Sequence, residues 1–106
     1  MSLSTHVLDV AAGHPAEGIA VRAELFDSGW RTVGTATTDA DGRVPVLVAD
    51  EDWHPGRWRI TFDLLSYLGE DAFFPAATVE FIIHETGRLH IPLLLSPFGY
   101  TTYRGS

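Results

Sequence analysis

Apolar and polar residues alternate with a period of two through most of this chain, and this alternation limits the fold more than any other feature. In residues 19–25, 58–64 and 77–83 every second residue is apolar. Such a run is typical of a half-buried antiparallel strand. Clusters of Gly, Pro, Asp and Ser separate the runs and predict turns. Many short strands with frequent turns indicate an all-β sandwich or barrel.

Residues 63–72 are the one segment that favours a helix, of a turn or two, closed by Gly69. The length of 106 residues predicts a single domain over residues 1–106. No apolar run approaches the roughly 20 residues of a membrane helix. The start of the chain lacks a signal-peptide pattern, so we expect a cytoplasmic protein. The formal charge of −7 argues against nucleic acid as a partner.

The run at 88–96 departs from the simple alternation. Its inward face is all apolar, but the outward face carries Pro92 and Leu94 beside His90. We expect Pro92 and Leu94 to face water in a monomer. An apolar outward face favours an interface with another subunit over a second layer from the same chain. Pro92 cannot donate to a ladder, so an edge or a bulge is expected there.

The residue types restrict the chemistry. Cysteine and lysine are absent, and all seven cationic side chains are Arg. The segment 84–90, His-Glu to His, lacks the spacing of the zinc helix motif, and residues 37–48 lack the end residues of a calcium loop. No metal is therefore expected. Asp41 and Gly42 predict a hairpin turn, with Arg43 at the start of the returning strand. A lone strand histidine such as His6 is more often structural than catalytic. His90 lies on the apolar outward face, and an imidazole in such a partly dry site can act as a general base on water, but neither histidine alone indicates an enzyme.

Several segments together resemble the 5-hydroxyisourate hydrolases, the transthyretin-related enzymes of urate breakdown. They are LSTHVLD at residues 3–9, TDADGRV at 38–44, FFP at 73–75 and HIPLLLSPFGYTTYRGS at 90–106. The terminal Tyr-Arg-Gly-Ser is the family's hallmark and distinguishes the hydrolases from transthyretin. The resemblance spans nearly the whole chain.

The resemblance implies a transthyretin-like sandwich of two four-stranded sheets with one short helix. It also implies a homotetramer, a dimer of dimers, with active sites in a channel between the dimers. The family usually has a histidine two positions before the last one of the site, where this chain has Arg88. The family's catalytic residues fall on His6, Arg43, His90 and Ser106, and its substrate-binding residues on His6, Arg43, Tyr103, Arg104 and Gly105.

The implied reaction is the hydrolysis of 5-hydroxyisourate, without cofactor, to 2-oxo-4-hydroxy-4-carboxy-5-ureidoimidazoline. His90, with His6, would activate water, and Arg43 would bind the substrate and stabilise charge on the carbonyl oxygen. Tyr103 would close on the substrate, and Ser106 would add hydrogen bonds. Which histidine is the base stays open. One alternative is a transthyretin-like carrier of an aromatic ligand, and another is a monomeric adhesion module. On the hydrolase reading, extending the chain beyond Ser106 is expected to impair activity more than stability.

Overall fold

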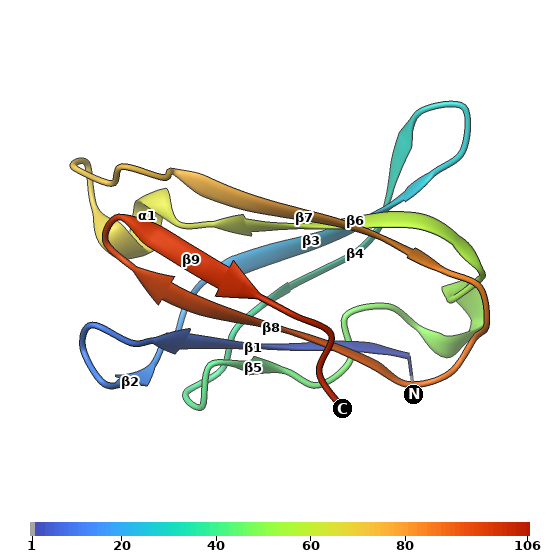
Figure 1. Ribbon diagram of the computed structural model, residues 1–106. Coiled ribbons are helices and arrows are strands. Elements are labelled where there is room, and N and C mark those ends of the chain that lie inside the picture. Colours follow the sequence, from blue (N-terminus) through green and yellow to red (C-terminus); the bar gives the residue numbers. More distant parts are fainter. Residues whose placement is uncertain (1) are drawn as a thin grey trace.

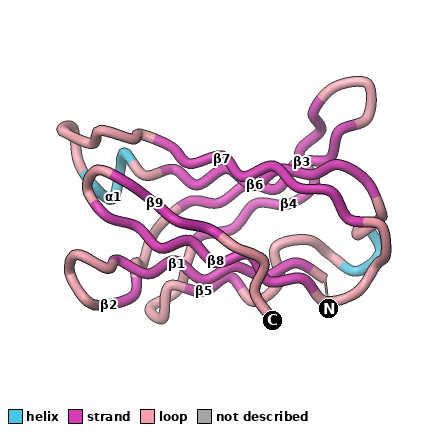
Figure 2. The backbone as a smooth tube through the Cα atoms, in the orientation of Figure 1, coloured by secondary structure: helices cyan, strands magenta, loops and turns pink. Residues whose placement is uncertain are grey.

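The computed structural model describes residues 2–106 as two β-sheets packed face to face (Figures 1 and 2). One sheet has the order β4-β3-β6-β7 and the other β2-β1-β8-β9, with β5 paired to β1 off that path. The predicted two-sheet sandwich is confirmed, but one sheet has five strands because the two-residue β5 joins it. The strands are β1 (Leu3–Asp9), β2 (His14–Pro15), β3 (Ala20–Phe26), β4 (Trp30–Thr37), β5 (Arg43–Val44), β6 (Gly56–Asp63), β7 (Ala76–Ile83), β8 (Leu89–Ser96) and β9 (Gly99–Thr102).

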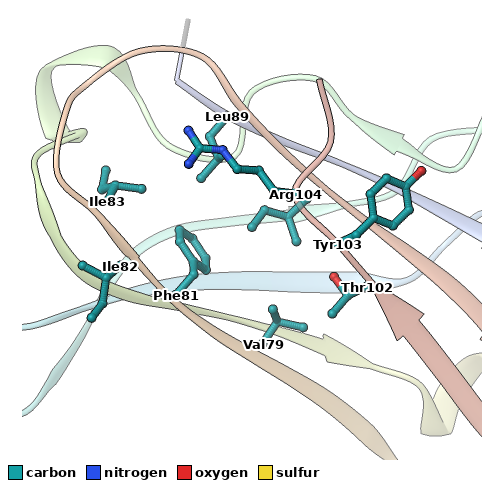
Figure 3. A pocket seen from close by; sticks show the side chains of 9 residues that line it. Val79, Phe81, Ile82, Ile83, Leu89, Thr102, Tyr103 and Arg104 are labelled. Carbon is teal, nitrogen blue, oxygen red and sulfur yellow. The ribbon is translucent and has the colours of Figure 1, made fainter.

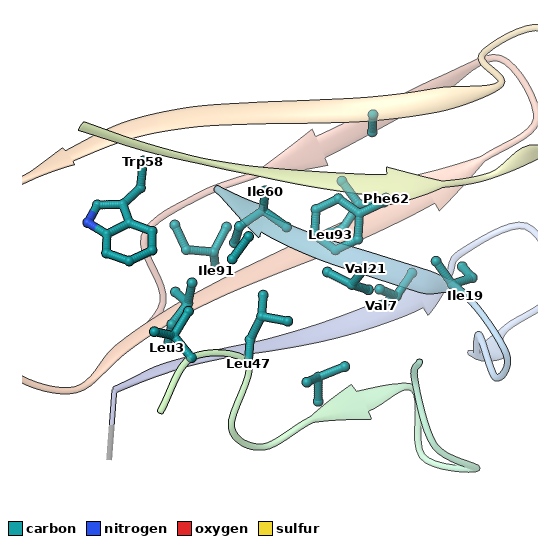
Figure 4. Packing of buried hydrophobic residues seen from close by; sticks show 14 of the residues in the cluster. Leu3, Val7, Ile19, Val21, Leu47, Trp58, Ile60, Phe62, Ile91 and Leu93 are labelled. Carbon is teal, nitrogen blue, oxygen red and sulfur yellow. The ribbon is translucent and has the colours of Figure 1, made fainter. Parts of the chain in front are cut away.

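The core lies between the sheets and follows the alternation in the sequence. Ile60 and Phe62 of β6 are fully buried against Leu93 of β8 and Val7 of β1 (Figure 4). Trp58 is also fully buried, and its ring lies 4.8 Å from that of Trp53. Fully burying one large apolar side chain stabilises a fold by about 1.5–3 kcal/mol. The predicted inward faces are therefore confirmed for the runs at 19–25 and 58–64.

Two short helical segments lie outside the sheets, the 3-10 turn η1 (Asp50–Asp52) and the α-helix α1 (Leu65–Leu68). The helix ends at Gly69, whose φ is 90°. Glycine adopts this conformation without the strain a side chain would add. The predicted single helical turn closed by Gly69 is confirmed. No helix within residues 2–106 is long and apolar enough to cross a membrane.

β8 is a central strand, and the predictions about Pro92 need correction. Parallel pairing with β1 continues without a break, with His6 opposite Pro92. Pro92 is buried within the single chain, so the prediction that it faces water is wrong. Leu94 is half-buried, so it is exposed only in part. The strands β1 and β9 flank β8 on its two sides, so Pro92 lies inside the sheet. The prediction of an edge strand or a bulge is also wrong, because β8 lies between two strands and its register with β1 has no shift.

Pairing does lapse on the other side of Pro92. β9 ends at Thr102, which lies opposite Leu93, and the chain pairs with β8 again at a single bridge between Gly105 and His90. The Thr102 hydroxyl donates to the Pro92 carbonyl at 2.8 Å. Since proline has no N–H, it fits where the neighbouring backbone moves away. The lapse frees Tyr103 and Arg104 from the ladder.

The turn before Arg43 is tight, but it does not form a hairpin. β4 belongs to the four-stranded sheet, whereas β5 pairs with β1 in the other sheet. The turn therefore carries the chain from one sheet to the other, and the hairpin prediction is wrong. Gly42 has a φ of 73°, and a Cβ there would lie 2.4 Å from the Val7 carbonyl oxygen. The close approach of β1 requires glycine at this position.

Candidate active site

Four polar side chains from three strands share the outward face of the five-stranded sheet. His6 lies opposite Arg43 of β5, and Ser4 lies opposite His90 of β8. Directly paired residues lie on the same face of a sheet, and Ser4 and His6 are two residues apart on one strand. The sheet thus brings together His6, Arg43 and His90, which the sequence predicted as site residues.

Asp39 fixes the backbone that carries Arg43. Its carboxylate accepts hydrogen bonds from the backbone N–H groups of Asp41 and Arg43, both at 2.9 Å. Its carbonyl accepts from the Gly42 N–H at 2.8 Å. An aspartate that bonds the backbone in this way stabilises a tight turn. Arg43 is therefore held at one place beside His6.

The hydrogen bond of His6 identifies its tautomer. The Nε2 atom lies 2.9 Å from the carbonyl oxygen of Asp41. A carbonyl oxygen only accepts, so Nε2 carries the proton and donates it. In the neutral ring, the lone pair of His6 is then on Nδ1. This bond ties His6 to the same turn that positions Arg43.

His90 is held on two sides. The Ser4 hydroxyl lies 2.8 Å from Nδ1, and the Gly105 N–H donates to the His90 carbonyl at 2.7 Å. A Cβ on Gly105 would lie 2.7 Å from Cδ2 of the His90 ring. No real side chain fits at that distance, so glycine is the residue that lets the C-terminal segment lie against the imidazole.

Ser4, Arg43 and His90 line a pocket of about 310 Å³ on the outward face. Ser106 of the C-terminal segment and Arg88 both line it. His6 lies next to the pocket and is not among its lining residues. The lining residues are Ser4, Thr5, Arg43, Pro45, Arg88, His90 and Ser106.

The pocket favours an uncharged imidazole. Burial lowers the pKa of His90 from its ordinary value, and the positive charges of His6 and Arg43 lower it further. His90 is therefore largely neutral at neutral pH. A neutral imidazole can take a proton from water, which is the property a general base requires.

The arginines separate into two groups. Arg22 and Arg59 pair with Glu24, and Arg57 pairs with Glu80, all on the four-stranded sheet. Within residues 2–106, the other four arginines have no carboxylate partner, and two of these four, Arg43 and Arg88, line the His90 pocket. A protein with a formal charge of −7 thus keeps two unpaired guanidinium groups at one pocket. Planar, permanently charged donors of this kind suit a planar anion.

Tyr103 and Arg104 lie at a different pocket, of about 200 Å³, between β7 and the β8–β9 side of the sandwich (Figure 3). The Arg104 side chain extends toward Leu89 (Figure 3). Within one chain, these two residues are therefore apart from the pocket of His90. Their role in binding substrate stays a prediction. The second pocket is lined by Val79, Phe81, Ile82, Ile83, Leu89, Ile91, Thr102, Tyr103 and Arg104.

Sequence reasoning missed Ser4, Thr5 and Pro45 and assigned no role to Arg88. The period of two could have placed Ser4 on the face of His6, since the two are two residues apart. The parallel register that sets Ser4 against His90 has no signal in the sequence. No group of three His, Asp or Glu side chains within residues 2–106 could hold a metal ion.

Together these features define a two-sheet sandwich with a histidine–arginine pocket on one outward face. The model of the HIUase/Transthyretin family matches residues 3–105. The 5-hydroxyisourate hydrolase of Mus musculus is 42% identical and covers 98% of this chain and 94% of its own length. The chain therefore belongs to the HIUase/Transthyretin family.

Solved structures of both branches of the family share this fold. The 5-hydroxyisourate hydrolase of Klebsiella pneumoniae superposes with a TM-score of 0.86 at 33% identity, covering 99% of this chain and 98% of its own. Sea bream transthyretin in complex with thyroxine gives a TM-score of 0.92 at 32% identity, covering 99% and 95%. Backbone similarity therefore does not distinguish a hydrolase from a carrier. The distinction has to come from the residues of the pocket.

Proposed function

We propose that this protein hydrolyses 5-hydroxyisourate to 2-oxo-4-hydroxy-4-carboxy-5-ureidoimidazoline, a step of urate degradation. The observation that carries the proposal is that His90 and the unpaired guanidinium of Arg43 line one pocket, where burial lowers the pKa of His90. Relatives bearing the hydrolase name span nearly the whole chain, including the Mus musculus protein at 42% identity. Both observations favour the hydrolase over a carrier of aromatic ligands.

In the proposed mechanism, His90 removes a proton from a water molecule while the water oxygen attacks a ring carbonyl carbon. General-base assistance of this kind contributes about 100- to 10,000-fold. The negative charge that develops on the carbonyl oxygen is stabilised by Arg43. The bond between that carbon and the ring nitrogen then breaks, the nitrogen takes up a proton, and the ring opens to a carboxylate.

The other predicted site residues have supporting roles in this proposal. The Nε2–H of His6 donates to the Asp41 carbonyl, and this bond orients the His6 ring beside Arg43. Ser106 lines the pocket and supplies hydrogen bonds to the substrate. Gly105 lets the C-terminal segment lie against His90. Tyr103 and Arg104 would reach substrate from the C-terminal segment.

The assembly belongs to the proposal as well. We expect one domain over residues 1–106, four copies of which form a dimer of dimers with the outward face of the five-stranded sheet lining a channel. The half-buried Leu94 and the 79%-exposed Phe98 support association through apolar surface. A cytoplasmic location stays a prediction, which fractionation of cells would test.

The test is an assay with freshly generated 5-hydroxyisourate, followed by its absorbance decay. We expect decay well above the buffer rate and a loss of about 100-fold or more for His90→Ala. Arg43→Ala should lose activity as well, whereas Arg31→Ala, an exposed arginine away from the pocket, should not. Decay no faster than in buffer, combined with tight binding of an aromatic ligand, would instead establish the carrier.

A further inference from the structure

We propose that Ser4 is a positioning residue whose Oγ accepts a hydrogen bond from the Nδ1–H of His90 and thereby directs the lone pair of Nε2 into the pocket. The inference rests on the proposed hydrolase function and deepens it. It assigns the general base to one atom, Nε2 of His90. It also gives a role to the serine two residues before His6.

The contacts around the ring support this assignment. Ser4 and His90 are opposite each other in the parallel β1–β8 pair, and Oγ lies 2.8 Å from Nδ1. Gly105 lies against Cδ2, where even a methyl group would clash. Within the described residues 2–106, no protein group hydrogen bonds to Nε2. The nitrogen left without a partner is therefore the one that can meet a water molecule.

The hydroxyl suits both protonation states of the ring. A serine hydroxyl accepts as well as donates. When Nε2 removes a proton from water, the water oxygen keeps the electron pair and forms the new bond to carbon. The ring then carries a proton on each nitrogen, and Nδ1–H continues to donate to Ser4. If Ser4 donated instead, the neutral ring would carry its proton on Nε2 and could not accept one there.

The surroundings distinguish Ser4 from the other neighbours of His90. His6 on β1, Arg43 on β5 and Arg88 just before β8 are the charged or titratable groups around the pocket. The guanidinium groups of Arg43 and Arg88 only donate. The His6 ring is bonded to the Asp41 carbonyl through Nε2, and the hydrogen-bond partner of His90 Nδ1 is the Ser4 hydroxyl. Arg104 lines the other pocket. Ser4 is thus the uncharged acceptor that makes Nδ1–H favourable.

The experiment compares Ser4→Ala with Ser4→Thr, which keeps the hydroxyl oxygen, and with Ser66→Ala, an exposed serine of α1. We expect Ser4→Ala to lower kcat about threefold to tenfold, the factor for one neutral hydrogen bond, with KM nearly unchanged. The acidic limb of the pH–rate profile should move to lower pH, because the cationic ring loses an acceptor. Ser4→Thr should restore both values, and Ser66→Ala should change neither.

Nitrogen-15 NMR of the His90 ring provides a readout independent of activity. We expect the neutral ring of the unmodified protein to carry its proton on Nδ1, and Ser4→Ala to shift it toward Nε2. A proton on Nε2 in the unmodified protein would overturn the inference. So would a Ser4→Ala variant with unchanged kcat and pH profile. If the protein had no hydrolase activity, the proposed function would fail, and the NMR spectra would still decide the role of Ser4.

Discussion

At the scale of single residues, the site depends on one glycine. A Cβ at position 105 would lie 2.7 Å from Cδ2 of His90 and 3.0 Å from its carbonyl oxygen. The first distance is shorter than real side chains show and the second is tight, so any other residue must displace the imidazole or the C-terminal segment. The Tyr-Arg-Gly-Ser ending thus has a steric requirement at its third position, whatever its other residues do.

We predict that Gly105→Ala lowers hydrolase activity by about tenfold to 100-fold, because a displacement of the order of 1 Å at a catalytic group has an effect of that size. Stability should change little, since Gly105 lies at the chain end and outside the core. Initial rates and thermal melts measure the two effects. Gly87→Ala is the matched control, because a Cβ there meets no atom within 4 Å. Equal activities of the two variants would contradict the steric argument.

The sequence allowed the types of site residue to be predicted better than their arrangement. His6, Arg43 and His90 were named from their segments, and the sheet places them on one face. Their proximity depends on pairings between strands far apart in the chain, which no local pattern encodes. The separation of Arg104 from the His90 pocket likewise follows from the lapse in pairing opposite Pro92.

At the scale of elements, a hydrogen bond ties helix α1 to the end of β1. The Tyr67 hydroxyl donates to the Asp9 carboxylate at 2.8 Å, and the same carboxylate accepts from the Ala12 N–H at 2.9 Å. Burial alone would raise the pKa of Asp9, but the bonds from Ala12 and Tyr67 outweigh it and lower the pKa. Burial, together with the bond to Asp9, raises the pKa of Tyr67 to about 12.

This pair should give stability a dependence on pH at both extremes. The folded pKa of Asp9 is depressed, so its contribution is present above the unfolded value near 4 and is lost as pH falls below it. The folded pKa of Tyr67 is raised, so its contribution is present below about pH 10 and is lost as pH rises toward about 12. Between these limits, both groups stabilise the folded chain.

We predict that Tyr67→Phe destabilises the protein by about 1 kcal/mol at pH 7, the net value of one hydrogen bond. The stability of the variant should no longer show the fall at alkaline pH that Tyr67 causes, and its fall at acidic pH should be smaller than in the unmodified protein. Denaturant unfolding at pH 3, 7 and 11 measures this. Tyr100→Phe serves as the control, because the Tyr100 ring packs against Phe74 and its hydroxyl has no hydrogen bond within the described residues. Parallel pH profiles of Tyr67→Phe and the unmodified protein would refute the linkage.

Element boundaries and faces followed from the alternation, whereas sheet membership did not. The runs at 19–25 and 58–64 became strands with the predicted side buried. The turn at Asp41 and Gly42 looked like a hairpin because local turn chemistry is the same whether the next strand pairs with the previous one or crosses over. The strand after the turn joins the other sheet, where Gly42 lies close to Val7, and this tertiary contact is not visible in the local sequence.

At the scale of the whole molecule, the strands β7 and β9 each end a sheet. An edge strand leaves unpaired backbone N–H and C=O groups that can pair with another chain. Ile82 of β7 is 60% exposed, and the apolar pocket that it lines opens beside this edge. The proposed assembly would pair such edges and cover this surface with a second copy.

We predict that Ile82→Asp reduces the assembly to a smaller species while the fold remains intact. Burying a carboxylate in an apolar interface is unfavourable because the charge loses its water. In a single chain, the carboxylate at this exposed position stays hydrated, so the fold should not suffer. Light scattering coupled to size-exclusion chromatography measures the mass, and circular dichroism the fold. Thr35→Asp, on the opposite edge strand β4, is the control and should assemble normally. An unchanged mass for Ile82→Asp would place the interface elsewhere.

The parallel pairing of β1 with β8 also affects how the site forms in time. Ser4 and His90 touch although 86 residues separate them in the chain. Contacts between such distant segments form slowly, because a long loop must close before they are made. A chain growing on the ribosome has β3, β4 and β6 available to pair long before β8 emerges. The pocket of Arg43 beside His6 can therefore form only after β8, which carries His90, has been synthesised. A chain truncated before β8 lacks His90 and has no site.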